Sequence, residues 1–124
     1  MKKSKHCKKK LREESIRDHL TNLYNRRYLH EILAKAIPRA HRGEEKLSFS
    51  LLDVDKFKEI NDTYGHAVGD EVLIHLSKLL SKNARQGDII CRFGGEEFLI
   101  FFANTTHKDA SLRTDEIRQV FEKS

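Results

Sequence analysis

The sequence has no apolar run that approaches the length of a membrane span, and it has no apolar signal segment. Cysteine is scarce as well, since Cys7 and Cys91 occur singly, without a CxxC pair or a Cys/His ligand pattern. Isolated thiols favour packing roles in a reducing compartment over a disulfide or a zinc site. These absences predict a cytoplasmic chain that does not cross a membrane.

Several ligand-binding motifs are also missing. The chain contains neither a Walker A loop nor a GxGxxG fingerprint, which excludes two common ways of binding phosphate. Six lysines fall within residues 1–10 and supply much of the formal net charge of +5, but no aromatic residue is interleaved with them. No DNA- or RNA-binding motif follows this run. A solvated tail or the charged start of a helix is therefore favoured over nucleic-acid or membrane-surface binding.

The 124 residues, 38% of them apolar and 35% charged, suit one globular domain. We expect residues 1–17 to form a basic segment or connector helix and residues 18–124 to form the domain. Hydrophobic periodicity and turn signals predict, in order, a polar turn (18–27), an amphipathic helix that Pro38 bends or ends (28–37), a buried strand (47–54), a helix (69–83), the two strands of a hairpin (89–93 and 98–102) and a weaker amphipathic helix (107–123). This order predicts an α+β fold related to the split βαβ arrangement.

Residues 92–98, RFGGEEF, join the two hairpin strands and are the most informative part of the sequence. Gly94 and Gly95 are expected to take the positive φ angles that a tight hairpin requires. Glu96 and Glu97 follow them, and adjacent side chains on a strand point to opposite faces. This alternation predicts unequal roles for the two carboxylates.

A second polar cluster lies at the carboxyl end of the predicted strand 47–54. Asp53 and Asp55, next to two lysines, could hold a divalent cation and phosphates together, and their oxygen atoms suit magnesium. The amides that open the turn after Asp55 could bind phosphate oxygens, as the start of a helix does. A calcium-binding EF-hand loop is excluded, because Phe57 and Lys58 stand where that loop needs a ligand and a glycine.

The two acidic clusters are remote in sequence, but neighbouring strands could bring Asp53 and Glu96 together. Two like charges at short range need a counter-ion, which gives a bound cation an electrostatic reason to exist. For any single acidic residue, a solvated position at the end of a strand remains the simpler interpretation. The pairing of the acids with a double-glycine hairpin in one short chain favours a site.

Three motifs carry a resemblance to a known family. The run RFGGEEF resembles the signature of the GGDEF family of diguanylate cyclases, DHLTNLYNRR resembles its first motif, and DVDKFKEINDTYGHAVGD resembles its nucleotide-binding segment. They occur in the family's order across residues 18–121. The resemblance implies an antiparallel sheet with flanking helices, similar to adenylyl cyclase and polymerase palm domains. It also implies condensation of two GTP molecules into cyclic di-GMP by an antiparallel homodimer with two Mg²⁺ or Mn²⁺ ions.

The resemblance also implies roles for individual residues. Asp53, the carbonyl of Val54 and Glu96 would hold metal, and Glu96 would accept the proton of the ribose 3′-hydroxyl with Glu97 assisting nearby. The guanine edge would be bound by Asn61 and Asp70, with His66 beside that pocket. The phosphates would lie near Phe57 and Lys58. The nucleotide would approach the backbone at Gly94 and Gly95.

Arg85 and Asp88 resemble the family's RxxD inhibitory site, where the guanines of the product bind. This four-residue pattern is weak by itself, and a surface ion pair near a turn is the default interpretation. Its place just ahead of the signature hairpin favours the functional interpretation.

The resemblance stops short of the family's usual end. A further strand and a helix carrying a lysine and an arginine normally follow the last helix, and the sequence contains neither. The missing strand would pair beside residues 47–54, so its loss is expected to leave an apolar edge and a marginally stable or self-associating chain. We keep two functions open: an active diguanylate cyclase, and a catalytically inactive regulatory module that binds GTP or cyclic di-GMP.

Overall fold

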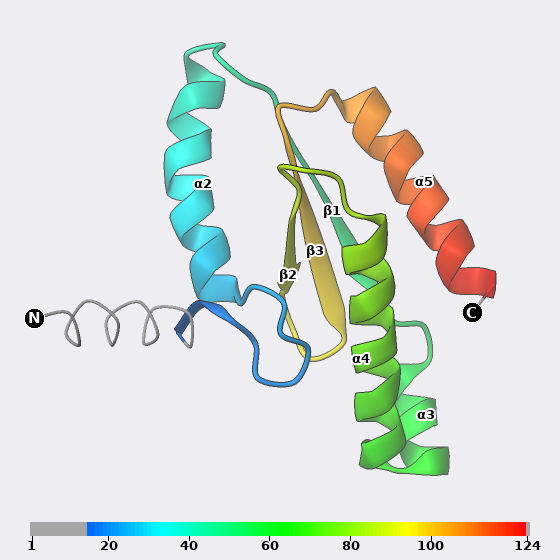
Figure 1. Cartoon of the computed structure of the whole chain (residues 1–124). Helices are drawn as coiled ribbons and strands as arrows, with labels where there is room; N and C mark the ends of the chain where they lie inside the picture. The colour runs from blue at the N-terminus through cyan, green and yellow to red at the C-terminus, as the bar shows by residue number, and fades with distance from the viewer. Residues whose placement is uncertain (1–14, 124) are drawn as a thin grey trace, which may run out of the picture.

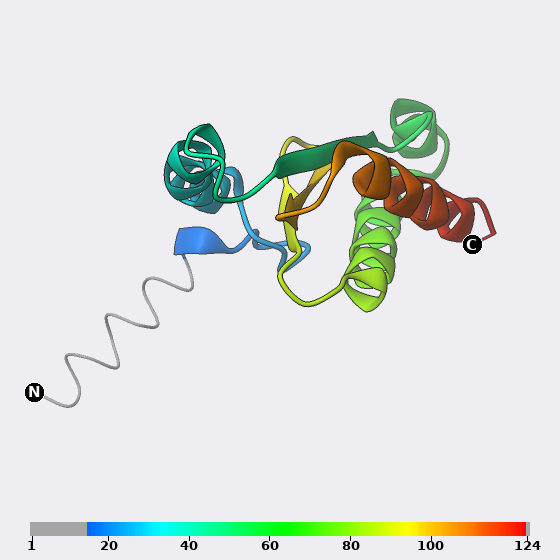
Figure 2. The ribbon, with the colours of Figure 1, turned by 90° about the horizontal axis from the view of Figure 1, so that it is seen from above.

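The computed structural model describes residues 15–123, so Cys7 and the lysine-rich run of residues 1–10 lie outside the described residues. The elements are α2 (Arg26–His41), β1 (Leu47–Asp53), α3 (Phe57–Tyr64), α4 (His66–Asn83), β2 (Ile89–Arg92), β3 (Glu97–Ala103) and α5 (His107–Lys123). The three strands form an antiparallel sheet in the order β1-β3-β2. Helix α2 covers one face, and α4 and α5 cover the other (Figures 1 and 2). The predicted α+β class is confirmed.

The central strand β3 supplies both halves of the core. Phe98 and Phe102 face α4 and α5, whereas Leu99 and Phe101 face α2, as the alternation of a strand requires. Cys91 on β2 is fully buried beside α2, and burial raises the pKa of its thiol to about 11. The expected packing role of this cysteine is therefore confirmed.

Helix α2 continues through Pro38 to His41, so of the two predicted effects of Pro38, bending or ending the helix, the second does not occur. Pro38 lacks the N–H that would bond one turn back, but it lies on the exposed side of the helix, where water can satisfy the freed carbonyl. The Pro38 carbonyl still accepts a hydrogen bond from the Arg42 amide at 3.1 Å. Proline at this place therefore costs one hydrogen bond without ending the helix.

The region between β1 and β2 holds two helices, not one helix over residues 69–83. Gly65 separates them with φ +90° and ψ 163°, a conformation that residues with a Cβ rarely adopt. Its amide bonds the carbonyl of Asn61 at 2.8 Å, and α4 starts immediately after it at His66. The glycine therefore folds α3 back against α4.

Strand β1 is an edge strand and is not fully buried, contrary to the prediction for residues 47–54. Phe49 and Leu51 pair with Phe101 and Leu99 on the sheet face that α2 covers, but the helix does not bury them, and they are 57% and 53% exposed. No strand within residues 15–123 pairs with the outer side of β1, whereas the outer side of β2 is bridged by Tyr24. The sheet is therefore closed at one edge and open at the other.

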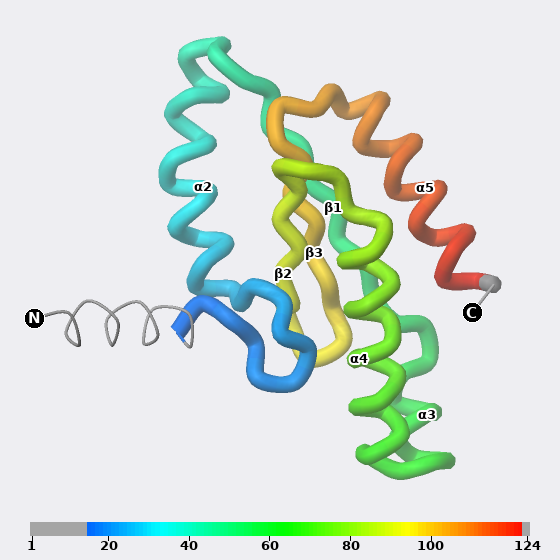
Figure 3. Tube along the Cα trace, viewed as in Figure 1, coloured from blue at the N-terminus to red at the C-terminus, as the bar shows by residue number. Residues whose placement is uncertain are grey.

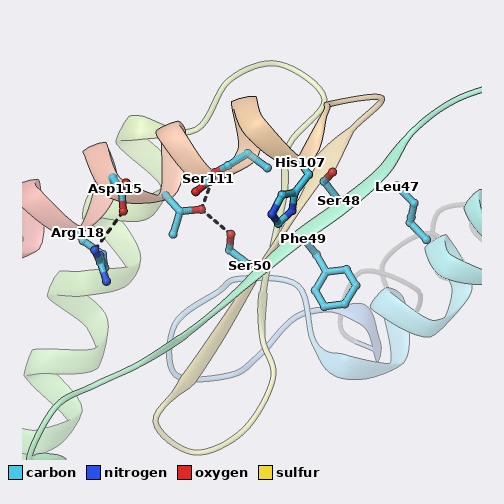
Figure 4. Close-up of a pocket in the computed structure, with 10 residues that line it drawn as sticks. Leu47, Ser48, Phe49, Ser50, His107, Ser111, Asp115 and Arg118 are labelled. Carbon is cyan, nitrogen blue, oxygen red and sulfur yellow. Dashed lines mark hydrogen bonds and ion pairs between the residues drawn. The ribbon is translucent and has the colours of Figure 1, made fainter.

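A groove of about 420 Å³ runs along the open edge of β1, between that strand and α5 (Figure 4). The hydroxyls of Ser50 and Thr114 share a hydrogen bond across its floor, and Ser48 Oγ donates to the Thr105 carbonyl at 2.7 Å. The first bond joins β1 to α5, and the second joins β1 to the segment just before α5, although no strand in the part of the chain that the structure describes pairs with the outer side of β1.

Among the described helices, none is long and apolar enough to cross a bilayer.

Candidate nucleotide and metal site

The turn between β2 and β3 is closed by backbone hydrogen bonds. The amides of Phe93 and Gly94 both donate to the carbonyl of Glu97, at 2.9 Å and 3.3 Å. Gly94 and Gly95 do not have positive φ angles, so the conformational reason expected for them was wrong. Gly94 is small for a steric reason instead: a Cβ there would lie 2.5 Å from Oε1 of Glu97. The absence of a side chain makes room for the carboxylate.

The end of β1 lies directly beside this turn. The strand register places Asp53 opposite Glu97, and the amide of Val54 donates to the carbonyl of Glu96 at 3.1 Å. The two acidic segments are therefore neighbours, as the sequence predicts. The register adds that Asp53 shares a sheet face with Glu97, while Glu96 belongs to the turn next to Val54.

The groups available to a metal here are oxygen atoms: the carboxylates of Asp53, Glu96 and Glu97 and the carbonyl of Val54. Within residues 15–123, no three His, Cys, Asp or Glu side chains form a group that could hold a metal by themselves. Magnesium does not need such a cage, because it keeps several waters and binds through one or two carboxylates together with substrate phosphates. The donor set therefore fits magnesium shared with a phosphate ligand.

An open cleft of about 390 Å³ lies beside the same end of β1. Asp53, Val54 and Asp55 line one side, and Arg118 from α5 lines the other. The sequence did not predict a contribution from α5 here, because nothing in the spacing of Arg118 indicates which strand the helix crosses.

A second part of the site lies between α3 and α4. Asn61 Oδ1 is buried and has no hydrogen-bond partner. Gly69 on α4 packs over it so closely that a Cβ would lie 1.9 Å from Oδ1 and 3.3 Å from the Phe57 ring. An unsatisfied buried acceptor costs about 1–3 kcal/mol, so a ligand that donates a hydrogen bond there would recover that cost. This orphaned oxygen is the strongest structural mark of a binding site.

The other residues predicted at this site lie around it. His66 and Asp70 are one turn apart on the exposed face of α4, and Phe57 is partly buried against the core. Lys56 precedes α3 with φ +55°, and Lys58 is exposed on its first turn. The fold therefore groups the predicted base-binding residues on α3 and α4 and the predicted phosphate-binding residues at the start of α3.

Three residues that the sequence did not single out hold the hairpin turn in place. The guanidinium of Arg92 donates to the Gly95 carbonyl at 2.8 Å and to both oxygens of Asp18 at 3.1 Å and 3.2 Å. Asp18 in turn accepts from the amide and hydroxyl of Thr21. Figure 3 shows the resulting proximity of the 18–22 turn to the hairpin. The first motif of the sequence thus supports the signature turn.

The pKa of Asp18 is altered by these contacts. Burial of the carboxyl acts to raise its pKa, but hydrogen bonds from Thr21 and Arg92 and the charge of Arg92 outweigh burial and lower the pKa below its ordinary value of 3.8. The unfolded chain therefore binds this proton more readily than the folded chain does. The ionised Asp18 carboxylate therefore stabilises the folded chain. Its contribution to the free energy of unfolding is fully present above the unfolded-state pKa of Asp18 and is lost as pH falls through the folded-state pKa.

We expect Asp18→Asn to destabilise the chain more at about pH 6 than at about pH 3, because the wild-type contribution is itself lost in acid. Urea unfolding of both proteins across this range measures the effect. The exposed Asp62→Asn variant is the matched control. A difference between wild type and Asp18→Asn that stays constant with pH would contradict the assignment.

In the predicted inhibitory pair, the side chain of Asp88 forms an ion pair with an arginine other than Arg85. Arg85 is exposed, and its amide donates to Oδ2 of Asp88 at 2.9 Å. The side chain of Asp88 forms its ion pair with Arg113 on α5, at 2.6 Å. Both ends of that ion pair are buried, so the default interpretation of a surface pair between Arg85 and Asp88 was wrong. Arg113 is a partner that local sequence spacing could not indicate.

The sequence of this chain is similar to those of known proteins. A family model described as the GGDEF domain of diguanylate cyclases matches residues 15–124. The response regulator PleD of Caulobacter vibrioides is 43% identical over 106 residues, which cover 86% of this chain and 23% of PleD. Diguanylate cyclase DosC of Escherichia coli is 42% identical over 113 residues, which cover 91% of this chain and 25% of DosC. The chain thus spans about a quarter of the length of these curated relatives.

A solved structure gives the same relationship in three dimensions. The coiled coil and GGDEF domain of DgcB from Caulobacter crescentus, in complex with c-di-GMP, matches with a TM-score of 0.87 at 28% identity. The match covers 94% of this chain and 61% of that one. The arrangement of strands and helices is therefore shared across nearly the whole chain.

Proposed function

The chain belongs to the GGDEF family of diguanylate cyclases, and on that basis we propose that it condenses two molecules of GTP into cyclic di-GMP and two pyrophosphates. One GTP would bind to each chain, and two chains would face each other as an antiparallel homodimer in the cytoplasm. The buried, unpartnered Asn61 Oδ1 is the observation that carries the nucleotide-binding part of this proposal.

The guanine base presents the hydrogen-bond donors that the pocket between α3 and α4 lacks. Its Watson–Crick edge presents N–H donors, and Asn61 Oδ1 is a buried acceptor without a donor. Asp70 supplies a second acceptor, and His66 lies on the same face of α4 one turn away. Adenine presents a different pattern of donors and acceptors, so these side chains favour guanine.

Replacing Gly69 with alanine is expected to weaken GTP binding by at least about tenfold, the loss of one good hydrogen bond to the base. The added Cβ would occupy the position of Asn61 Oδ1, which must move. The fold should persist, because the displaced atom is the end of a side chain. Calorimetry with GTP measures the affinity, and Ala67→Gly, at an exposed position on the same helix, is the control. Undiminished affinity in Gly69→Ala would remove Asn61 from the base pocket.

The reaction requires a proton acceptor and a fixed approach. In the proposed step, the 3′-oxygen of one nucleotide forms a bond to the α-phosphorus of the other. The bond from that phosphorus to the β-phosphate bridging oxygen breaks, and pyrophosphate leaves. Glu96 takes the proton of the hydroxyl, and Glu97 supports it from the first residue of β3. The hydrogen bonds between Arg92 and Gly95 hold the turn that carries both carboxylates.

Asp53, the Val54 carbonyl and Glu96 would hold Mg²⁺ or Mn²⁺, which when bound neutralises triphosphate charge and makes the hydroxyl more acidic. Lys58 at the start of α3 and the backbone amides there would add positive potential near the phosphates. At Gly95 an added Cβ would meet no atom within 4 Å, so the backbone there is open to the nucleotide.

The proposal is tested by incubating the chain with GTP and Mg²⁺ and quantifying both products by mass spectrometry and a pyrophosphate assay. We expect one cyclic di-GMP for every two pyrophosphates, and a rate that rises more steeply than protein concentration, since two chains must meet. A chain that binds GTP but yields no cyclic dinucleotide at a concentration where it is dimeric would favour the inactive regulatory module.

We further propose that cyclic di-GMP inhibits the enzyme at the loop of residues 85–88, through Arg85 and Asp88. The loop borders a cleft of about 360 Å³ that α5 closes on its other side. Asp88 offers two carboxylate oxygens to guanine donors, and the exposed Arg85 offers donors to its acceptors.

A further inference from the structure

Arg113 is the most completely engaged charged side chain near the proposed inhibitory loop. Its Nη1 donates to Oδ1 of Asp88 at 3.0 Å, and its Nη2 contacts Oδ2 at 2.6 Å. The guanidinium carbon lies 4.9 Å from the centre of the fully buried Phe102 ring. The side chains of Arg113 and Asp88 are 9% and 5% exposed, so water competes poorly for the ion pair.

This geometry uses the same atoms that a guanine ligand would use. A guanidinium and the Watson–Crick edge of guanine each present two N–H groups, which can bind the two oxygens of one carboxylate. The Arg85 amide already takes a further position on Oδ2 of Asp88. Asp88 therefore cannot bind guanine with both oxygens while Arg113 remains in place.

The Asp88 side of the cleft is nevertheless accessible to a ligand once the ion pair opens. Both Asp88 and Arg113 line the cleft of about 360 Å³, together with Arg85. Arg113 comes from α5, whereas Asp88 comes from the loop before β2, so a shift of either element separates the pair. Product binding and the ion pair are thus alternative states of one carboxylate.

We propose that Arg113 is an internal competitor of the cyclic dinucleotide product, so that the 85–88 loop binds product only in molecules where the Arg113–Asp88 ion pair is open. This inference rests on the proposed function of the loop. It deepens that function by assigning a residue on α5 to set the product concentration at which inhibition begins. Apparent affinity falls in proportion to the fraction of molecules in the open state.

The test compares wild type with Arg113→Met, a variant that keeps an unbranched side chain against Phe102 and removes both donors. Calorimetry with cyclic di-GMP should give at least tenfold tighter binding to Arg113→Met. Lys108→Met is the matched control, because Lys108 is an exposed cation on the same helix that lines none of the clefts described above. Asp88→Asn combined with Arg113→Met should abolish the gain, which would locate the ligand at Asp88.

Unchanged or weaker binding in folded Arg113→Met would overturn the proposal. If that variant does not fold, Arg113→Lys, which keeps the charge but loses the two-pronged contact, should still bind product more tightly than wild type. Nitrogen-15 NMR of arginine side chains in the wild type gives an independent measure: saturation with product should expose the Arg113 N–H protons to exchange, and continued protection would refute competition. Calorimetry measures the binding of cyclic di-GMP and needs no turnover. A chain that does not convert GTP would therefore refute the proposed activity but would leave the measured difference in product affinity between wild type and Arg113→Met unchanged.

Discussion

Replacing Glu96 with glutamine is expected to lower the rate of cyclic di-GMP formation by about a thousandfold or more. The amide keeps the size of the side chain but cannot accept the proton of the 3′-hydroxyl, and general-base catalysis alone contributes about 10²–10⁴ in rate. The same change removes one carboxylate from the donors proposed for the metal. The initial rate of product formation under saturating GTP and Mg²⁺ measures the effect.

Two controls make this result specific. Glu44→Gln changes an exposed glutamate that pairs with Arg42 far from the hairpin, and it should leave the rate unchanged. Thermal unfolding should show that Glu96→Gln is as stable as wild type, since the Glu96 contact to β1 runs through its backbone carbonyl. A variant that retains more than about a tenth of wild-type activity would show that Glu96 is not the base.

Replacing Phe98 with alanine is expected to destabilise the chain by about 3–5 kcal/mol. Phe98 is fully buried on β3, and its ring packs in the core that α4 and α5 cover. The truncation loses the transfer free energy of the ring and leaves a cavity. Because small domains have only about 5–15 kcal/mol of total stability, the variant should be largely or partly unfolded at ambient temperature. Urea unfolding followed by circular dichroism measures the change.

Phe49→Ala is the matched control for this prediction. Phe49 has the same side chain on the neighbouring strand, but it is 57% exposed on the open edge of the sheet. Its removal should cost less than about 1 kcal/mol. Equal losses for the two variants would mean that a second copy or another segment covers β1 in solution, which measurement of molecular mass would then reveal.

The sequence predicted most of the fold because its periodicities are locally strong. The continuous apolar run in β3 and the helical spacing of α4 and α5 depend on near neighbours in the chain, and these elements lie close to where the sequence predicts them. The errors arose where tertiary position decides. Pro38 was tolerated because it faces solvent, and Phe49 was left exposed because β1 lies at the edge of the sheet.

The candidate site was predicted from the sequence only in part. The adjacency of Asp53 to the hairpin followed from strand pairing and is present in the register. The orphaned Asn61 Oδ1 and the proximity of Gly69 depend on how α3 packs on α4, which spacing does not specify. The partnership of Arg113 with Asp88 joins residues 25 positions apart and likewise needs the folded chain.

The link from Asp18 through Arg92 to the Gly95 carbonyl ties the segment ahead of α2 to the loop that bears the acidic pair. A twist or pull applied at the start of the domain would reach that loop through one rigid guanidinium, which makes two hydrogen bonds to Asp18 and two to the Gly95 carbonyl. Arg92 is the last residue of β2, next to the loop, and its side chain spans the whole distance between Asp18 and Gly95. A displacement of the Asp18 carboxylate would therefore either move the Gly95 carbonyl with it or break one of the hydrogen bonds to Arg92.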